Sequence, residues 1–427
     1  MAAAVLVVAY ILIFAELMHR TIAAVIGAVC MVLVGMLGGF YSQSAAVAAI
    51  DANTMFLLVG MMLLVSMLKP TGGFEYAAIR MAKLAKGSPA RLLVYLSSLV
   101  TVCSMFLDNV TTVLVFAPLT VVIARMLGIS PVPYLIAEAL MSNTGGVATL
   151  VGDPPNIMIG SAAGIDFTRF LVHMGPIILF VWAATLLVLL TLFRKDLAGK
   201  IDEVLDLDES RVLKDRKRLL AVSLSIGLVI LLFFVHHRFH FFPGYVAWMG
   251  AAVGMALVRP DPEALLKDLD WAVLLFFAGL FIIVGGVEGS GLLGLLGQLL
   301  ASGAQDPQRL MLTALIVMWV AALLSAVVDN IPFTVTMIPI ISHLQTRGVD
   351  VMPLWWALAL GVGLGGNATH IGSTANVICV AAAERTGIER YHISPMYWMK
   401  RGVPVMFAGL TVASILLVVF FDNYRGS

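Results

Sequence analysis

The sequence predicts an all-α polytopic membrane protein: ten transmembrane helices plus two re-entrant hairpins in two inverted repeats, with broken helices at the site. Composition is the first reason, because 61% of the 427 residues are hydrophobic, 12% are charged and the mean hydropathy is +1.01. Soluble domains carry about 25% charged residues. A repeat is the second reason, since the pair Asp108-Asn109 returns 221 residues later as Asp329-Asn330.

The first repeat is predicted over residues 1–193, with five spans and one hairpin. Apolar runs of about 16 to 20 residues are roughly long enough for a helix that crosses a bilayer. The predicted elements are spans at 2–18, 21–39 and 54–68, a basic amphipathic piece at 74–86, a re-entrant hairpin at about 90–127, a broken helix at about 133–163 and a span at 170–193. A polar linker at 194–218 follows.

The second repeat is predicted over residues 219–427 in the same order. Its elements are spans at 219–235, 243–258 and 271–287, a Gly-rich piece at 289–303, a re-entrant hairpin at about 308–346, a broken helix at about 352–383 and a span at 397–421. An odd number of crossings in each half gives the two halves opposite orientations. This inverted-repeat plan is typical of many secondary transporters.

Lys and Arg residues favour the same topology through the positive-inside rule. With these helices, 21 of the 26 basic residues fall on one side and five on the other. We therefore expect a multi-pass protein of the cytoplasmic (inner) membrane, with the central linker in the cytoplasm and both termini outside. The first apolar run has no basic region before it and is expected to be a retained helix.

The two Asp-Asn segments allow two interpretations, because a hairpin and a pair of full spans both return the chain to the same side. Arms at 90–107 and 110–126 would be roughly 25 to 27 Å long, slightly less than the roughly 30 Å of hydrocarbon. Two residues also make a tight connection between full spans. We favour hairpins whose tips stop near mid-membrane, where irregular backbone is tolerated only against protein or a water-filled cavity.

A second repeated motif interrupts the span after each hairpin. Residues 145–156 (GGVATLVGDPPN) match residues 365–376 (GGNATHIGSTAN), with six of twelve positions identical. Glycines and prolines in mid-span predict an unwound segment whose freed backbone groups can bind a polar solute. Close helix packing is the alternative for the glycines. The helix-break candidates are Gly145, Gly146, Gly152, Pro154, Pro155, Gly365, Gly366 and Gly372.

Carboxylates inside a membrane are costly and are functional-site candidates by default. The candidates for proton coupling are Asp108, Asp329, Glu138 and His370, since carboxyl and imidazole groups can carry a proton. An interhelical hydrogen bond is the alternative for Glu138 and a structural role the alternative for His370. Asp153 is interpreted either as a helix cap or as a site residue.

Hydroxyl groups and the absence of basic side chains complete the prediction for the site. Thr112 is a candidate to donate or accept at the site, although such residues more often bond back to their own helix. No Lys or Arg falls within either repeated motif. The pattern therefore favours a neutral polyhydroxy solute or a cation, and argues against sulfate, phosphate or citrate.

The sequence resembles the arsenite permease and melanosomal P-protein branch of the ion transporter superfamily over nearly its whole length. The motifs that carry the resemblance are LDNVTT from Leu107 with Pro118, residues 136–149, and GDPPN from Gly152. The resemblance implies an elevator-like carrier domain that moves against a scaffold, and often a homodimer. The binding residues it implies are Asp108, Asn109, Asp329 and Asn330 at the tips, and Thr149, Asn156, Thr369 and Asn376 at the breaks.

One departure from this family pattern concerns the second break, which reads GSTAN from Gly372 instead of GDPPN. The two half-sites are therefore expected to be chemically unequal. Which half carries the proton stays open.

The function predicted first is export of arsenite or antimonite, as the neutral trihydroxide, in exchange for protons. A Na⁺/H⁺ antiporter is the alternative, and a carrier of organic or inorganic anions is less favoured. No GxxxxGK[ST], HExxH or GxSxG segment is present, so we expect no enzyme activity, and an ATPase would have to be a separate subunit. No cofactor, metal or nucleic acid is expected.

Overall fold

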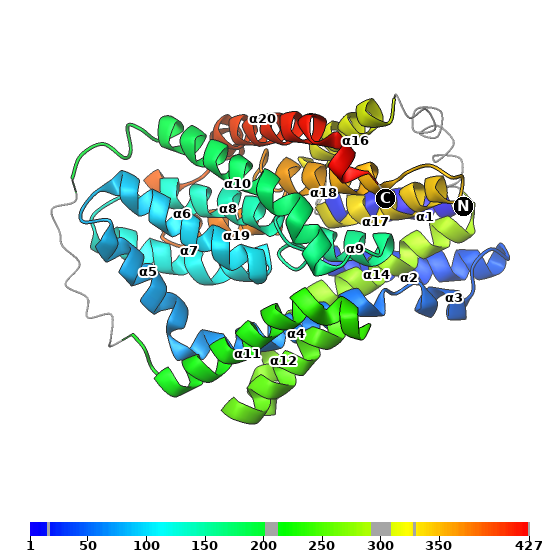
Figure 1. The fold of residues 1–427 in the computed structure, drawn as a ribbon, viewed down its shortest axis with the longest axis horizontal. Coiled ribbons are helices and arrows are strands. Elements are labelled where there is room, and N and C mark those ends of the chain that lie inside the picture. Colours follow the sequence, from blue (N-terminus) through cyan, green and yellow to red (C-terminus); the bar gives the residue numbers. More distant parts are fainter. Residues whose placement is uncertain (15–17, 201–211, 292–308, 328–329, 426–427) are drawn as a thin grey trace.

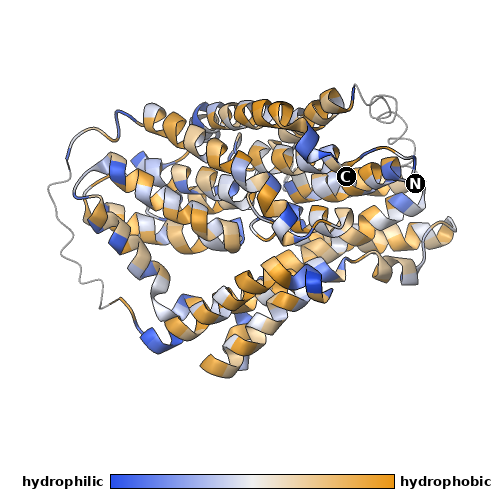
Figure 2. Cartoon of the chain, in the orientation of Figure 1, coloured by the Kyte–Doolittle hydropathy of each residue, from blue (hydrophilic) through white to orange (hydrophobic). Residues whose placement is uncertain are grey.

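The computed structural model in Figure 1 describes residues 1–427 except 15–17, 201–211, 292–308, 328–329 and 426–427. Every regular element in this part of the chain is a helix. Among the described residues, eight helices are long and apolar enough to cross a membrane, and five shorter apolar helices accompany them. Most helical residues in Figure 2 are hydrophobic, while hydrophilic ones gather toward helix ends and connections. The prediction of an all-helical polytopic membrane protein is confirmed.

The first half of the chain contains ten α-helices and one 3₁₀ turn among its described residues. Their bounds are α1 (Ala2–Phe14), α2 (Arg20–Leu37), α3 (Gln43–Ala48), α4 (Ala52–Leu68), η1 (Lys69–Thr71), α5 (Gly73–Leu84), α6 (Pro89–Phe106), α7 (Asn109–Met126), α8 (Val132–Gly146), α9 (Pro154–Ala163) and α10 (Phe167–Leu192).

The second half repeats the order of the longer helices. Its described elements are α11 (Arg216–Val235), η3 (His236–Phe239), α12 (Pro243–Val258), α13 (Pro262–Lys267), α14 (Trp271–Gly289), α16 (Leu310–Ser325), α17 (Asn330–Gln345), α18 (Met352–Gly365), α19 (Thr374–Glu384), η4 (Glu389–Tyr391), α20 (Pro395–Val419) and η5 (Phe421–Tyr424). Most of the predicted Gly-rich piece at 289–303 lies outside the described residues.

Several helices begin two or three residues before their predicted starts because a polar side chain caps them. Asp51 accepts a hydrogen bond from the backbone of Thr54 at the start of α4, and Asp166 accepts one from the backbone of Arg169 at the start of α10. Such caps satisfy backbone N–H groups that the first turn of a helix leaves unpaired. A hydropathy pattern does not include these capping residues in the helix because they are polar.

Most of the helices pack in two groups, and α10 and α20 pack on each other beside them. One group contains α1, α2, α4, α11, α12 and α14, and the other contains α6 to α9 with α16 to α19. In Figure 1, α4, α11 and α12 lie along the lower edge, α20 lies along the upper one, and α10 runs from the upper left toward the middle. We call the first group the outer group and the second the central group.

Packing partners recur when each helix is exchanged for its counterpart in the other half. α6 packs on α8 as α16 packs on α18, and α2 packs on α14 as α12 packs on α4. Across the halves, α7 packs on α19 and α17 packs on α9. The helix that follows each Asp-Asn pair therefore lies against the second part of the broken helix of the other half.

Helix length does not distinguish re-entrant hairpins from full spans. The arms α6 and α7 have 18 residues each and belong to the eight helices that could cross a membrane. The count of ten spans plus two hairpins, and the boundaries of the two repeats, stay predictions.

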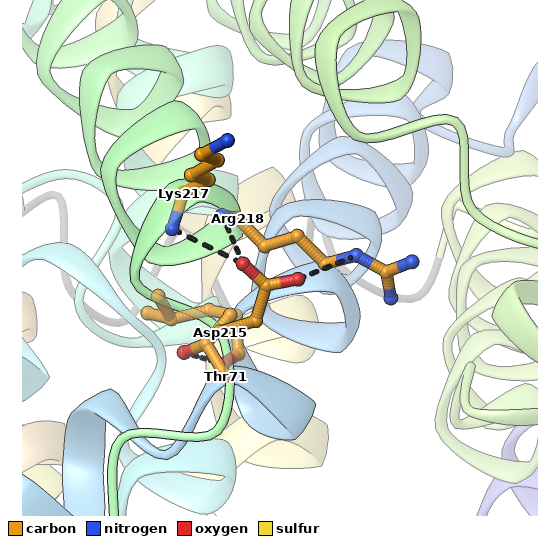
Figure 3. A network of polar contacts seen from close by, with 5 residues as sticks. Thr71, Asp215, Lys217 and Arg218 are labelled. Atoms are coloured by element: carbon orange, nitrogen blue, oxygen red, sulfur yellow. Dashed lines mark hydrogen bonds and ion pairs between the residues drawn. The ribbon is translucent and has the colours of Figure 1, made fainter.

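The start of α11 is fastened to the end of α4 through a small polar network (Figure 3). The Asp215 carboxylate accepts hydrogen bonds from the backbone N–H groups of Lys217 and Arg218, at 3.1 and 2.9 Å. The Arg218 side chain approaches the same carboxylate at 3.2 Å. One residue earlier, the backbone N–H of Lys214 donates to the Thr71 carbonyl at 3.0 Å. The chain thus enters the second half beside the end of α4.

Candidate functional site

Each predicted broken helix is interrupted by a short non-helical segment. In the first half, α8 ends at Gly146 and α9 begins at Pro154, while in the second half α18 ends at Gly365 and α19 begins at Thr374. Pro154 and Pro155 occupy the first turn of α9, where a missing N–H costs nothing. The prolines therefore start the second half-helix, and the unwound segment precedes them.

Four of the candidate glycines allow the two ends of each break to cross closely. A Cβ on Gly152 would lie 2.6 Å from the Gly146 carbonyl oxygen, and one on Gly372 would lie 2.7 Å from the Gly366 carbonyl oxygen. Larger residues at these positions would push the ends of the break apart.

Gly145 and Gly365 have a different role, because both lie in the last turn of their helices. A Cβ on Gly365 would lie 2.4 Å from the Ala322 carbonyl oxygen of α16, and one on Gly145 would lie 2.4 Å from the Thr101 carbonyl oxygen of α6. Close helix packing, the alternative considered from the sequence, is what these two glycines provide.

An asparagine closes each break by binding two of its carbonyl groups. Asn156 Nδ2 donates to the carbonyl oxygens of Gly146 and Thr149, both at 3.0 Å. Asn376 makes the same two bonds to the equivalent residues of its own half, both at 2.8 Å. Two carbonyl groups of each break are thereby satisfied within the protein, as a dry interior requires.

A threonine in each break ties it to the neighbouring hairpin segment. The Thr149 hydroxyl donates to the Met105 carbonyl, and the Thr369 hydroxyl donates to the Ala326 carbonyl at 2.5 Å. In this structure the donor groups of these threonines and of the two break asparagines therefore serve the protein itself.

The first hairpin tip combines a helix cap with two unpartnered polar atoms. Asp108 accepts hydrogen bonds from the backbone N–H and the hydroxyl of Thr111, at 2.8 and 2.6 Å, and so caps α7. Asn109 Oδ1 and Thr112 Oγ1 are buried and have no hydrogen-bond partner among the described residues. Their side chains are only 2% and 1% exposed. Buried polar atoms nearly always have a hydrogen-bond partner. Since these two have none, a bound solute could supply it.

Asn143, on α8, joins the first tip to the second break. Its Oδ1 accepts hydrogen bonds from Asn109 Nδ2 at 3.2 Å and from Ser373 Oγ at 2.9 Å. Its Nδ2 donates to the Oδ1 atoms of Asn367 and Asn376, both at 3.0 Å. All four hydrogen-bonding positions of the amide are used.

Sequence reasoning missed Asn143 and Asn367 as site residues because neither is repeated. In the other half, Asn143 corresponds to Gly363 and Asn367 corresponds to Val147. The corresponding contact is apolar, since a Cβ on Gly363 would lie 2.2 Å from a Val147 methyl group. The sequence did contain a signal for them, because each is an asparagine at a position where the other half has a non-polar residue.

The second tip meets the first break through Asp153. Asn330 Nδ2 lies 3.3 Å from both oxygens of the Asp153 carboxylate, and both side chains are buried. Asp153 stands at the start of α9 but its side chain makes no capping bond there. The position predicted for Asp329 lies outside the described residues.

The other two candidates for proton coupling have contrasting surroundings. Glu138 is fully buried, the Thr120 hydroxyl donates to its Oε1, and its Oε2 has no partner among the described residues. His370 lies half-buried in the second break and forms no hydrogen bond with the described residues. The bond to Thr120 links α8 to α7 and is the interhelical contact considered as the alternative for Glu138.

A basic side chain from outside the two motifs reaches the second break, and this weakens the argument against an anionic solute that rested on the motifs alone. Arg20 Nη1 donates to Thr374 Oγ1 at 2.6 Å, and its guanidinium lies 5.3 Å from the ring centre of Phe276. Arg20 begins α2, 354 residues before Thr374 in the chain. The motifs themselves contain no basic residue, and only the packing of α2 reveals this one.

The comparisons with known proteins identify the family. A family model described as citrate transporter matches residues 10–361. The chain belongs to the citrate transporter family. A 46 kDa membrane protein of Mycobacterium leprae (strain TN) is 37% identical over 422 residues, covering 97% of this chain and 96% of that protein. An uncharacterized transporter of Mycobacterium tuberculosis (strain ATCC 25618 / H37Rv) is 38% identical and covers 97% of both chains.

The P protein of Homo sapiens is 33% identical over 500 residues, which cover 98% of this chain and 59% of the P protein. The P-protein part of the predicted resemblance is thus confirmed, while a specific relation to arsenite permeases stays a prediction. Among solved structures, the Alcanivorax borkumensis YdaH transporter matches with a TM-score of 0.62 and 15% identity, covering 95% of this chain and 98% of that one. This similarity shows a shared fold with a membrane transporter.

The hub role of Asn143 can be tested with a nearly isosteric change. Asn143→Asp replaces the donor Nδ2 with a carboxylate oxygen. That oxygen cannot donate to the Oδ1 atoms of Asn367 and Asn376, so both of these acceptors lose their hydrogen bond to residue 143. We expect the free energy of unfolding to fall by about 2 kcal/mol or more, since unsatisfied buried groups cost about 1–3 kcal/mol each. Thermal unfolding of the purified protein measures the change.

The matched control is Asn53→Asp, because Asn53 uses its oxygen to accept a hydrogen bond from the Gly244 backbone at 2.9 Å. A carboxylate keeps that bond, so this variant should melt near the wild-type temperature. Equal melting temperatures for Asn143→Asp and the wild type would contradict the hub role.

Proposed function

We propose that this chain is a secondary active transporter that exports arsenite or antimonite, as the neutral trihydroxide, across the cytoplasmic membrane in exchange for protons. The observation that carries the proposal is the meeting of tips and breaks around buried, unpartnered polar atoms. A transport site near mid-membrane between repeated, discontinuous helices is a recurrent design of secondary transporters.

The chemistry of these atoms suits a neutral solute with hydroxyl groups. Asn109 Oδ1 accepts hydrogen bonds, and the Thr112 hydroxyl can both donate and accept. A trihydroxide offers three O–H donors and carries no charge that the protein would have to neutralise. Buried polar contacts of this kind supply orientation and specificity in small-molecule sites.

Proton exchange requires a group that gains and loses a proton as the solute leaves and enters. Glu138 is suited to this role because its Oε2 has no partner among the described residues, so a proton there breaks no existing hydrogen bond. The Thr120 hydroxyl, donating to Oε1, connects Glu138 to α7, which begins at the first tip. Protonation of Glu138 can thus affect the first tip, because α7 connects Thr120 to Asn109.

An alternating movement of the central group against the outer group accounts for release on the other side. Two side chains of the outer group hydrogen-bond to the second half-site. Tyr10 of α1 donates to the Pro332 carbonyl at 2.8 Å and lies 2.7 Å from the Thr336 hydroxyl, and Arg20 of α2 donates to Thr374. Sliding of the central group would exchange these contacts for others.

Removing the Asp108 charge tests the site. Asp108→Asn removes the charge but retains an N-cap residue of similar quality, so α7 should still form. We expect uptake of arsenite into inverted membrane vesicles, driven by an imposed proton gradient, to fall at least tenfold.

Asp166→Asn is the matched control, because Asp166 caps α10 in the same manner, with the Arg169 backbone N–H at 2.9 Å. It should transport like the wild type. Wild-type uptake in Asp108→Asn would remove Asp108 from the proposed site.

Coupling to protons is tested separately with Glu138→Gln, which keeps the size of the side chain and cannot exchange a proton. We expect arsenite exchange without a gradient to persist while acceleration by a proton gradient is lost. A pH-sensitive dye inside the vesicles should report proton movement with arsenite in the wild type and none in the variant. An unchanged ratio of protons to arsenite in Glu138→Gln would exclude this residue as the coupling group.

A second candidate function is transport of an organic anion such as a tricarboxylate. Arg20 favours it because guanidinium groups bind carboxylates well, and the family model that matches the chain is described as citrate transporter. The same vesicles should then take up citrate, and Arg20→Gln should reduce that uptake at least tenfold. Absence of citrate uptake in the wild type excludes this candidate, and a dye response to sodium alone selects a Na⁺/H⁺ antiporter.

A further inference from the structure

A cavity of about 180 Å³ opens at the end of α7 that lies away from the tips. One wall comes from the last turns of α7 and the residues that follow it, including Arg125 and Gly128. The opposite wall comes from the connection between α19 and α20, including Thr386, Arg390 and Tyr391. The cavity therefore lies on a seam between the first and second halves of the chain.

Among the described residues, those that line this cavity include two arginines, Arg125 and Arg390, and no acidic residue. Neither Arg125 nor Arg390 forms an ion pair with any described residue. Arg390 is oriented by Tyr391, because it donates to the phenol oxygen at 2.9 Å and lies 4.9 Å from the ring centre. Glu384, on α19, pairs instead with His392 at 3.6 Å.

The predicted hairpin tip near mid-membrane places this cavity at the membrane surface. Arg125 is 16 residues beyond Asn109, which is roughly 24 Å at 1.5 Å per residue. A tip near mid-membrane places Arg125 beyond the roughly 15 Å of hydrocarbon in one leaflet and at the level of the headgroups. The positive-inside rule assigns this surface to the cytoplasm.

We propose that this cavity binds the phosphate group of an anionic membrane lipid. Two arginines can each present paired N–H donors to phosphate oxygens, and basic pockets between helices on the cytoplasmic side suit anionic headgroups. Free inorganic phosphate shares this chemistry, so the experiment must distinguish the two sources. A bound phosphate bridges α7 of the first half to the α19–α20 connection of the second and stabilises the seam.

The test uses the full chain, purified in a mild neutral detergent, and measures the melting temperature against added lipid. Phosphatidylglycerol should raise the melting temperature with saturation, and phosphatidylcholine should not. In Arg125→Gln and in Arg390→Gln, the half-saturating concentration should rise about fivefold or more, because one charge near a membrane surface contributes about 1 kcal/mol.

Arg385→Gln is the matched control, since Arg385 stands in the same connection, is exposed and does not line the cavity. It should respond to phosphatidylglycerol as the wild type does. The melting temperature of each variant without lipid shows that it is folded, so a lost response is not confused with a lost fold.

Two other outcomes would contradict the proposal, one for the source of the phosphate group and one for the location of the site. If inorganic phosphate alone reproduces the shift, and the two cavity variants lose it, the ligand is the free anion, which overturns the lipid assignment. If Arg125→Gln and Arg390→Gln respond like the wild type, or if Arg385→Gln loses as much as they do, the cavity is not the binding site.

Discussion

The rest of this structure depends on the rule that an unwound backbone inside a membrane must find its hydrogen-bond partners within the protein. Both breaks obey it in the same way. Asn156 and Asn376 each hold two carbonyl groups of their own break, and Thr149 and Thr369 tie the breaks to the adjacent hairpin segments. With these bonds made, two spans can be interrupted and their backbone brought next to the hairpin tips.

The two predicted repeats bring chemically different residues to the proposed site. Asn143 joins the first tip to the second break through four hydrogen bonds, while its counterpart Gly363 packs on Val147. In the other half-site, the Asp153 carboxylate meets Asn330. The repeated residues of the two breaks share one backbone arrangement, and the residues that depart from the repeat make the two half-sites differ. In the proposed site, a solute at the centre would meet an amide network on one side and a carboxylate on the other.

The sequence predicted the features that rest on local pattern or on repetition. Apolar runs located the longer helices to within a few residues, and the repeated glycine motif located both helix breaks. The first Asp-Asn pair separates α6 from α7 as expected, whereas Asp329 lies outside the described residues. Asn143 and Asn367 escaped because they interrupt the repeat, and Arg20 escaped because a long side chain from a distant helix reaches Thr374. These contacts depend on how α2, α8 and α18 pack, and packing between distant segments leaves no periodic signal.

The exchange of partners between the halves has a consequence for biosynthesis. α7 packs on α19 and α17 on α9, and three of the four bonding partners of Asn143 lie after residue 366. While the ribosome is still translating the second half, the inserted first half holds an amide and a helix face without their partners. The central group can therefore complete its packing only after nearly the whole chain has been synthesised. We expect membrane quality control to degrade a truncated product.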